Sequence, residues 1–198
     1  MFWQTRKIEG RHTMDTPLTF SPIVRENWTD YKTLMESRGA PHYCWCTAWI
    51  KVKSQERKAQ KSEKKATMKE RINDGVPVGL LAYLSGKPIG WCSIAPRETY
   101  KKLGGDETKG QVWSVVCFFI KKEYRKKGFT SRLLAEAVKY AKESGAKYVE
   151  GYPVAVDSPS YRFMGVKPLF ENAGFKFIKK SGTRRNVFLR DLGESLHD

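Results

Sequence analysis

The hydrophobic positions of this chain change their period along its length, and each change predicts a structural element. Residues 112–120 form an almost unbroken apolar run, which is typical of a strand buried on both faces. A basic turn through Gly128 follows this run, and apolar residues then recur at helical spacing until Gly145. The sequence therefore predicts a buried strand, a tight turn and an amphipathic helix in this part of the chain.

The same criteria divide the rest of the chain into shorter elements. Helical segments are expected at 28–39, 53–73 and 167–173, and the second of these is polar on nearly every side. Strands are expected at 18–24, 79–84, 88–95, 148–154, 175–178 and 186–190. The two strands at 79–84 and 88–95 flank Ser85-Gly86-Lys87, which predicts a hairpin. The order β-α-α-β-β-β-α-β-α-β-β predicts a mixed α+β fold with helices packed on a sheet.

Length and hydropathy narrow the class of protein further. The 198 residues suit one domain, which we place at 14–198. Residues 1–13 contain Ile8-Glu9-Gly10-Arg11, which resembles a protease-cleavable linker, so we set them aside as a tag or an N-terminal extension. No apolar run reaches membrane-spanning length, and the N-terminus lacks an apolar signal core. We therefore expect a cytoplasmic protein without a membrane partner.

The formal net charge of +16 raises nucleic acid as a partner. The basic residues are spread over several segments, and no zinc-finger spacing, helix-turn-helix pattern or RNA-binding aromatic strand accompanies them. These observations argue against a nucleic-acid partner. A basic RNA-associated protein that uses residues 51–71 remains a remote alternative.

Four cysteines, at 44, 46, 92 and 117, suit reduced thiols in a cytosolic chain, because two of them lie in strand-like stretches. Cys44-Trp45-Cys46 with the nearby His42 suggests a metal site, but a third and a fourth ligand at suitable spacing are absent from the sequence. We expect no metal. Aromatic residues that surround a bound molecule and plain packing of aromatics against the sheet both fit this segment.

The turn after the central strand has the character of an anion site. Successive backbone N–H groups at a helix N-terminus favour an anion, and five basic residues surround this one: Lys121, Lys122, Arg125, Lys126 and Lys127. The segment is neither a P-loop nor a dinucleotide-binding fingerprint. Arg125-Lys126-Lys127-Gly128-Phe129-Thr130 resembles the pyrophosphate loop of the GNAT N-acetyltransferases, whose pattern is Arg/Gln-x-x-Gly-x-Gly/Ala. Thr130 departs from the small residue at the last position of that pattern.

The resemblance to GNAT proteins covers roughly residues 18–190 and implies a three-layer α/β/α fold with splayed central strands. It implies acetyl-CoA as the acetyl donor, with the pantetheine arm paired to the backbone of Phe118, Phe119 and Ile120. The remaining cofactor-binding residues would then be Arg125, Lys126, Lys127, Gly128, Phe129, Thr130 and Ser131. Core packing alone would also explain Phe118 and Phe119.

Two residues are candidates for the catalytic acid and base. In many GNAT proteins the acid is a tyrosine four residues before the Gly-Phe that ends the last helix, and here that position is Phe170. Tyr161 is a candidate substitute acid, and an exposed loop tyrosine is the alternative. Glu150 lies in a largely apolar strand, where desolvation would raise its pKa toward that of a base. A structural role for Glu150, paired with a lysine or at a solvated face, is an equal alternative.

The resemblance implies an N-acetyltransferase that transfers the acetyl group of acetyl-CoA to a primary amine. The alternative is a non-catalytic module that binds an acyl-CoA and acts through a partner, which the missing tyrosine at position 170 favours. The identity of the amine and the formation of a homodimer remain open.

Overall fold

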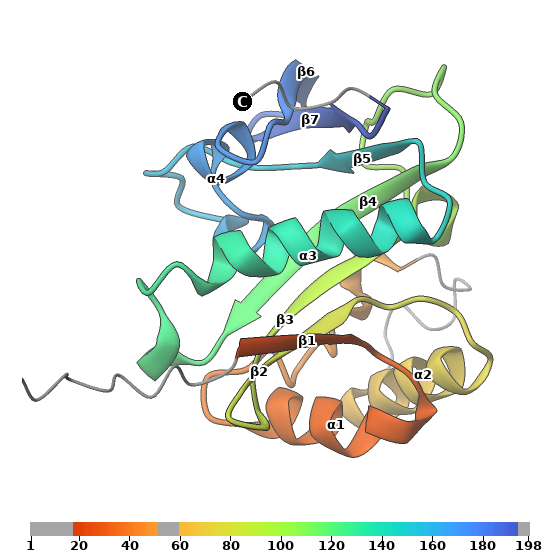
Figure 1. Ribbon diagram of the computed structural model, residues 1–198, viewed down its shortest axis with the longest axis vertical. Helices are drawn as coiled ribbons and strands as arrows, with labels where there is room; N and C mark the ends of the chain where they lie inside the picture. Colours follow the sequence, from red (N-terminus) through yellow and green to blue (C-terminus); the bar gives the residue numbers. More distant parts are fainter. Residues whose placement is uncertain (1–17, 51–59, 194–198) are drawn as a thin grey trace, which may run out of the picture.

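The computed structural model describes residues 18–50 and 60–193. Their centre is one seven-stranded sheet of order β1-β2-β3-β4-β5-β7-β6 (Figure 1). The strands are β1 (Leu18–Pro22), β2 (Leu80–Leu84), β3 (Lys87–Pro96), β4 (Val112–Ile120), β5 (Tyr148–Gly151), β6 (Lys176–Ser181) and β7 (Arg185–Asp191). Only β4 and β5 pair in parallel, and the other neighbours are antiparallel. The expected mixed α/β architecture is confirmed.

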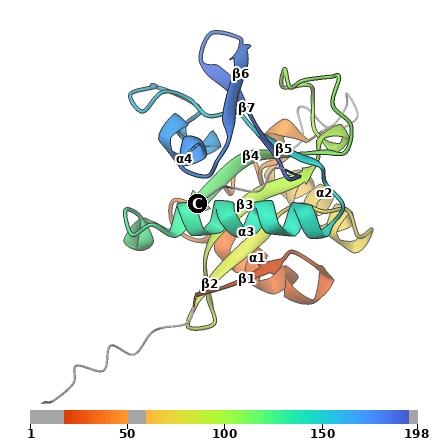
Figure 2. The ribbon, with the colours of Figure 1, turned by 45° about the horizontal axis from the view of Figure 1, so that its top comes forward.

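Helices cover both faces of this sheet and give three layers (Figures 1 and 2). They are α1 (Trp28–Glu36), α2 (Lys61–Asn73), α3 (Phe129–Glu143) and α4 (Lys167–Glu171). Apolar residues of α1 and α2 belong to one buried cluster, and those of α3 and α4 belong to a second one. Each face of the sheet therefore has its own hydrophobic core.

The central strand, the turn and the long helix lie where the hydrophobic pattern predicts them. The strand after α3 is shorter than the predicted 148–154 and ends at Gly151. Pro153 lacks a backbone N–H and cannot extend the ladder. Val154 instead forms a parallel bridge with Val166, which draws the chain away from β4.

The separation of β4 and β5 creates the opening that matters for function. The two strands pair only from Val112 with Tyr148 to Val115 with Gly151. On the β3 side, the register shifts between Ser93, the partner of Cys117, and Ile94, the partner of Val115, so that Val116 forms a bulge. From Val116 to Ile120, the edge of β4 that faces away from β3 therefore has no strand partner in the described structure.

The polar helix expected at 53–73 is present as α2 from Lys61, while residues 53–59 lie outside the described part of the chain. Only Met68 and Ile72 of α2 are buried. Lys65 pairs with Glu36 of α1 at 2.5 Å, so an ion pair adds to these few apolar contacts. Within the described ranges, no helix combines the length and the apolar character needed to cross a membrane.

Candidate active site

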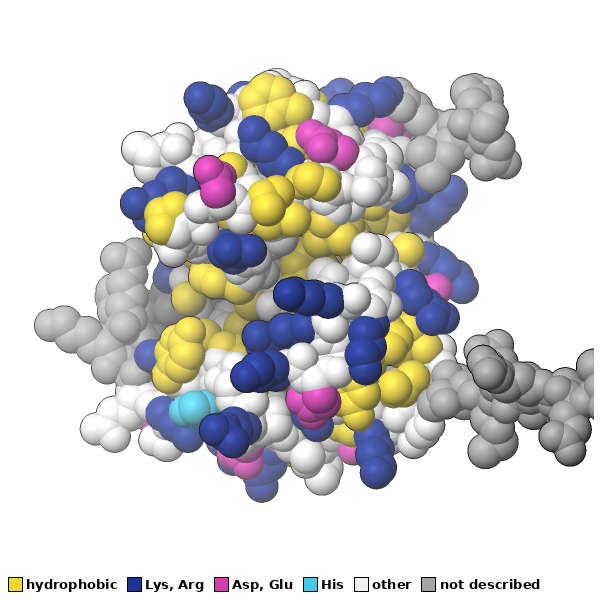
Figure 3. All heavy atoms as spheres, turned by 90° about the vertical axis from the view of Figure 1, so that its left-hand side faces the viewer, with side chains coloured by type: hydrophobic (Ala, Val, Ile, Leu, Met, Phe, Trp, Pro, Cys, Tyr) yellow, Lys and Arg dark blue, Asp and Glu magenta, His cyan; other side chains and the backbone are white. Residues whose placement is uncertain are grey.

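A groove of about 670 Å³ opens where β4 and β5 separate. One wall comes from the end of β4 and the start of α3, and another comes from residues 39–49, which follow α1. Residues 162–169, around α4, complete the lining. Figure 3 shows this side of the molecule as a hollow with hydrophobic side chains inside it and Lys and Arg side chains along its lower rim. The groove is therefore apolar inside and basic at its edge.

Five of the predicted cofactor-binding residues line this groove: Phe118, Phe119, Ile120, Arg125 and Thr130. The first three lie on the part of β4 that pairs with β3 but not with β5, so its other backbone edge is open to an added chain. Arg125 folds back and donates from Nε to the Ile120 carbonyl at 2.8 Å. This bond connects the turn to the end of β4.

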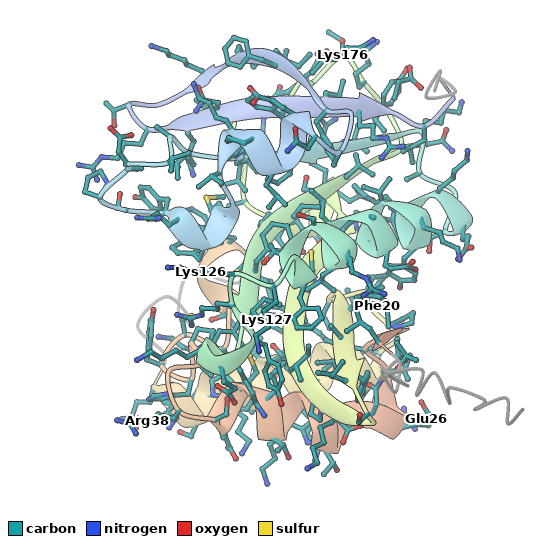
Figure 4. The ribbon with its side chains drawn as sticks, turned by 60° about the vertical axis from the view of Figure 1, so that its left-hand side comes forward. Phe20, Glu26, Arg38, Lys126, Lys127 and Lys176 are labelled. Carbon is teal, nitrogen blue, oxygen red and sulfur yellow. The ribbon has the colours of Figure 1, made fainter. Side chains whose placement is uncertain are left out.

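The turn itself leaves the N-terminus of α3 open. Lys126 and Gly128 have left-handed backbone φ angles of 62° and 76°, and Gly128 is the N-cap without a side-chain capping bond. The first N–H groups of a helix have no intrahelical partner, so those of Phe129, Thr130 and Ser131 face outward as donors. Figure 4 shows Lys126 and Lys127 on this turn, beside the end of β4. The predicted residues that do not line the groove thus surround its α3 end.

Two thiols of the opposite wall meet a third thiol from β4, and this proximity is not visible in the sequence. Cys44, Cys46 and Cys117 all line the groove, and the Sγ atoms of Cys46 and Cys117 lie 3.5 Å apart. Trp45 and Cys46 have left-handed φ angles of 46° and 51°, an uncommon backbone conformation that turns the Cys46 N–H toward Cys44 Sγ at 3.3 Å. Within the described residues, no group of three or more His, Cys, Asp or Glu side chains could hold a metal ion.

The thiols of Cys44 and Cys46 differ in acidity. Hydrogen bonds from the Cys46 thiol and backbone, together with the charge of Lys64, lower the pKa of Cys44 from 9.0 to about 7, although burial opposes this change. Burial raises the pKa of Cys46 well above its ordinary value. Cys44 is therefore the member of the pair that ionises near neutral pH.

Aromatic side chains gather where Trp49 meets residues 161–163, beside Arg185 of β7. The rings of Trp49, Tyr161 and Phe163 have pairwise centroid distances of 6.0 to 6.4 Å. The Arg185 guanidinium lies over Trp49 at 5.3 Å and over Tyr161 at 6.0 Å. Trp49 and Phe163 line the groove, whereas Tyr161 is 37% exposed and stands outside the lining.

Glu150 lies at the closed end of the strand pair and is fully buried. Oε1 accepts hydrogen bonds from Ser114 Oγ at 2.6 Å and from the Tyr152 hydroxyl, and Oε2 pairs with Arg97 at 3.3 Å. A Cβ atom added to Gly105 would lie 2.1 Å from Oε2, so that loop covers the carboxylate. Glu150 does not line the groove.

Phe170, at the position of the tyrosine acid in the resembled family, packs in the core. Its ring lies 6.2 Å from that of Phe118 and 5.1 Å from that of Phe175, both edge-on. Gly151 of β5 lets this ring approach, because a Cβ atom there would lie 2.1 Å from it. The position supplies no proton donor.

The splayed parallel pair, the bulged central strand and the open helix N-terminus define a protein of the acyltransferase class. A family model described as the acetyltransferase (GNAT) family matches residues 31–164, more than half of the chain. The chain therefore belongs to the GNAT family of acetyltransferases, and acetyl-CoA is its acetyl donor. No curated protein matches it.

Solved structures of other acetyltransferases share the fold. AAC(6')-Ib in complex with paromomycin and acetyl-CoA has a TM-score of 0.57 at 12% identity, covering 88% of this chain and 93% of that one. The PaiA N-acetyltransferase of Thermoplasma acidophilum in complex with coenzyme A gives 0.52 at 16% identity, covering 88% and 99%. A GNAT acetyltransferase of Streptococcus pneumoniae gives 0.54 at 16%, covering 89% and 100%. At such identities the likeness concerns the fold alone.

Proposed function

We propose that this protein transfers the acetyl group of acetyl-CoA to a primary amine, and that both substrates meet in the groove beside β4. The observation that carries the proposal is the convergence of two features on one apolar groove. These features are the unpaired backbone edge of β4 and the uncapped N-terminus of α3. The first suits an extended pantetheine arm, and the second suits a pyrophosphate.

The donor would bind along one wall. The backbone of Phe118–Ile120 would pair with the amides of the pantetheine arm, and the N–H groups of residues 129–131 would hold the pyrophosphate. Arg125, Lys126 and Lys127 would add positive charge at the same place. Gly128 contributes by its left-handed φ of 76°, which turns the chain so that these donors point outward.

The acceptor would bind at the other end, against the wall that holds Cys44 and Trp49. Among the described lining residues, the charged side chains are Arg125 and Arg162, and there is no carboxylate. A polycationic acceptor would find no counter-ion there, and a charge without a partner is costly to desolvate. The groove thus favours an amine attached to an apolar or aromatic body, which the rings of Trp49 and Phe163 would contact.

Neither predicted catalytic residue has the geometry of a group that touches the substrates. A base must reach the proton that it removes, and Glu150 already accepts from Ser114, Tyr152 and Arg97 beneath a loop. We assign it a structural role at the closed end of the strand pair. Tyr161 stands at the rim of the aromatic group, where it fits acceptor binding better than proton transfer.

The test combines donor binding with turnover. Calorimetry with acetyl-CoA measures the first, and release of free CoA thiol over a panel of primary amines measures the second. Aromatic and aliphatic monoamines should release CoA faster than polyamines and aminoglycosides. Donor binding without thiol release for any amine would instead indicate the non-catalytic acyl-CoA-binding module, which the phenylalanine at position 170 favours. Failure to bind acetyl-CoA would overturn the proposal.

A further inference from the structure

The three thiols lie where the donor and acceptor ends of the groove meet. Cys117 follows the bulge at Val116, the point at which β4 loses its pairing with β5. Its Sγ contacts that of Cys46 at 3.5 Å, and both side chains are buried. Cys44 lies beside them and is only partly buried. A thioester whose pantetheine arm follows β4 would thus end close to these sulfur atoms.

The surroundings of Cys44 favour its thiolate. The N–H of Cys46 points at Cys44 Sγ from 3.3 Å, because Trp45 and Cys46 hold left-handed backbone conformations. Non-glycine residues in that region store strain, which persists where it serves a site. The neighbouring Cys46 thiol and the positive charge of Lys64 also lower the pKa of Cys44, while the Cys44 thiol itself donates only a long bond of 3.5 Å to the Pro41 carbonyl. These contacts hold the pKa of Cys44 at about 7, so the thiolate is well populated at neutral pH.

No other group in the described lining of the groove competes with this thiolate. That lining holds no carboxylate and no imidazole. Burial raises the pKa of Tyr43 and of Cys46, which keeps both protonated near neutral pH. Cys117 is buried against Cys46, whereas Cys44 is only partly buried. Arg125 and Arg162 are cations without nucleophilic character. Cys44 is therefore the nucleophile that this part of the groove presents.

We propose that Cys44 accepts the acetyl group from bound acetyl-CoA and carries it as a thioester before transfer to the amine. The inference rests on the proposed function, because acetyl-CoA must occupy the groove. In the first step the Cys44 sulfur attacks the acetyl carbonyl, the new C–S bond forms, the C–S bond to CoA breaks, and CoA leaves as a thiolate that takes a proton from water. One thioester replaces another, so the step is nearly balanced in free energy.

In the second step the neutral amine attacks the acetyl carbon on Cys44. The C–N bond forms, the C–S bond breaks, the Cys44 thiolate is regenerated, and the ammonium proton passes to water. In both steps the leaving group is a thiolate, which departs without a general acid. The phenylalanine at position 170 and the enclosed position of Glu150 are consistent with this route, since neither side chain is needed as an acid or a base.

Isotope exchange without any amine tests the proposal. The full chain is incubated with acetyl-CoA and labelled CoA, and the label that enters acetyl-CoA is followed. A thioester on the protein makes this exchange possible, whereas direct transfer to an amine does not. Wild-type protein should catalyse the exchange. Cys44→Ser should lower it by about a hundredfold or more, because a serine hydroxyl is not ionised at neutral pH. Cys92→Ala, a buried cysteine of β3 outside the groove lining, is the matched control and should retain the exchange.

Peptide mapping of wild-type protein after acetyl-CoA treatment locates the acetyl group independently of any variant. It should lie on Cys44, and fragmentation between Cys44 and Cys46 distinguishes the two. Acetyl-CoA binding, measured by calorimetry, distinguishes failure of the thioester route from failure of the proposed function. Binding with no exchange, with acetylation at another residue, or with exchange retained in Cys44→Ser overturns the thioester route and leaves the proposed function standing. Absence of binding overturns both.

Discussion

The two ends of the β4–β5 pair are built from the same strands but differ in structure and in role. At the closed end, Ser114 and Glu150 face each other across paired strands, and Arg97 and Gly105 cover them. At the open end, the bulge at Val116 and the bridge from Val154 to Val166 separate the chains, and the groove takes the place of a strand pair. Both ends hold an ionisable group in mostly apolar surroundings. Only the open end leaves that group accessible, so accessibility separates a reactive residue from a structural one.

The largest expected effect concerns the acidity of Cys44 at the open end. Its alkylation by iodoacetamide should follow a titration with a midpoint of about 7 and should fall below that pH as the thiolate is protonated. Relative to an ordinary pKa of 9.0, this is about a hundredfold more thiolate at a given acidic pH. Cys92, which is fully buried, should not react in the folded protein. A midpoint near 9 would show that the contacts from Cys46 and Lys64 do not stabilise the thiolate.

At the closed end, Glu150→Gln should affect stability more than chemistry. The substitution keeps the size of the side chain but leaves Arg97 without its buried counter-charge, which should lower the free energy of unfolding by about 2 kcal/mol. Urea denaturation measures this change. Turnover with a reactive amine, measured where the variant is folded, should change by no more than about threefold, because Glu150 does not line the groove. A loss of about a hundredfold without loss of donor affinity would restore Glu150 as the base.

Glu150 also shows what could and could not be predicted from the sequence. The strand at 112–120, the turn and the helix after it follow from local periodicity, so their positions were predictable. The partners of Glu150 were not, because Arg97 is 53 residues away in the chain and is held by the carbonyls of Asp106 and Lys109. A carboxylate in an apolar strand has the same local pattern whether a substrate or an arginine faces it.

The thiols at the open end of the strand pair illustrate the same limit of sequence-based prediction. Cys44 and Cys46 are two residues apart and form a visible motif in the sequence, but Cys117 is 71 residues from Cys46 and joins them only in the fold. The acidity of Cys44 depends on left-handed conformations at Trp45 and Cys46, which neither residue type favours. Periodicity carries no information on such backbone angles. The part of the groove along β4 and α3 was therefore predictable, whereas the meeting of its three thiols was not.

A glycine substitution tests the donor side of the open end. Gly128→Val should lower acetyl-CoA affinity about tenfold or more, about 1.4 kcal/mol, because a side chain obstructs the approach of the pyrophosphate to the backbone. Gly86→Val, in the hairpin between β2 and β3, is the matched control. Both glycines have left-handed φ angles, 76° and 72°, and an added Cβ meets no atom within 4 Å at either. Both variants should lose similar stability, and calorimetry should find reduced affinity only for the first. Equal affinity in both would remove the pyrophosphate from this turn.

The smallest effect should come from the exposed lysines of the same turn. Replacing Lys126 and Lys127 together by Ala should weaken acetyl-CoA binding about two- to threefold at low salt, since exposed charges contribute little. The difference should disappear near 1 M salt, where the screening length falls to about 3 Å. Lys139 and Lys142, exposed near the other end of α3, provide a control pair with the same change in net charge. Because a helix rises about 1.5 Å per residue, they lie roughly 20 Å from the turn. Their replacement should leave affinity unchanged at both salt concentrations, and an equal loss in both pairs would mean that net charge, rather than the position of the turn, attracts the donor.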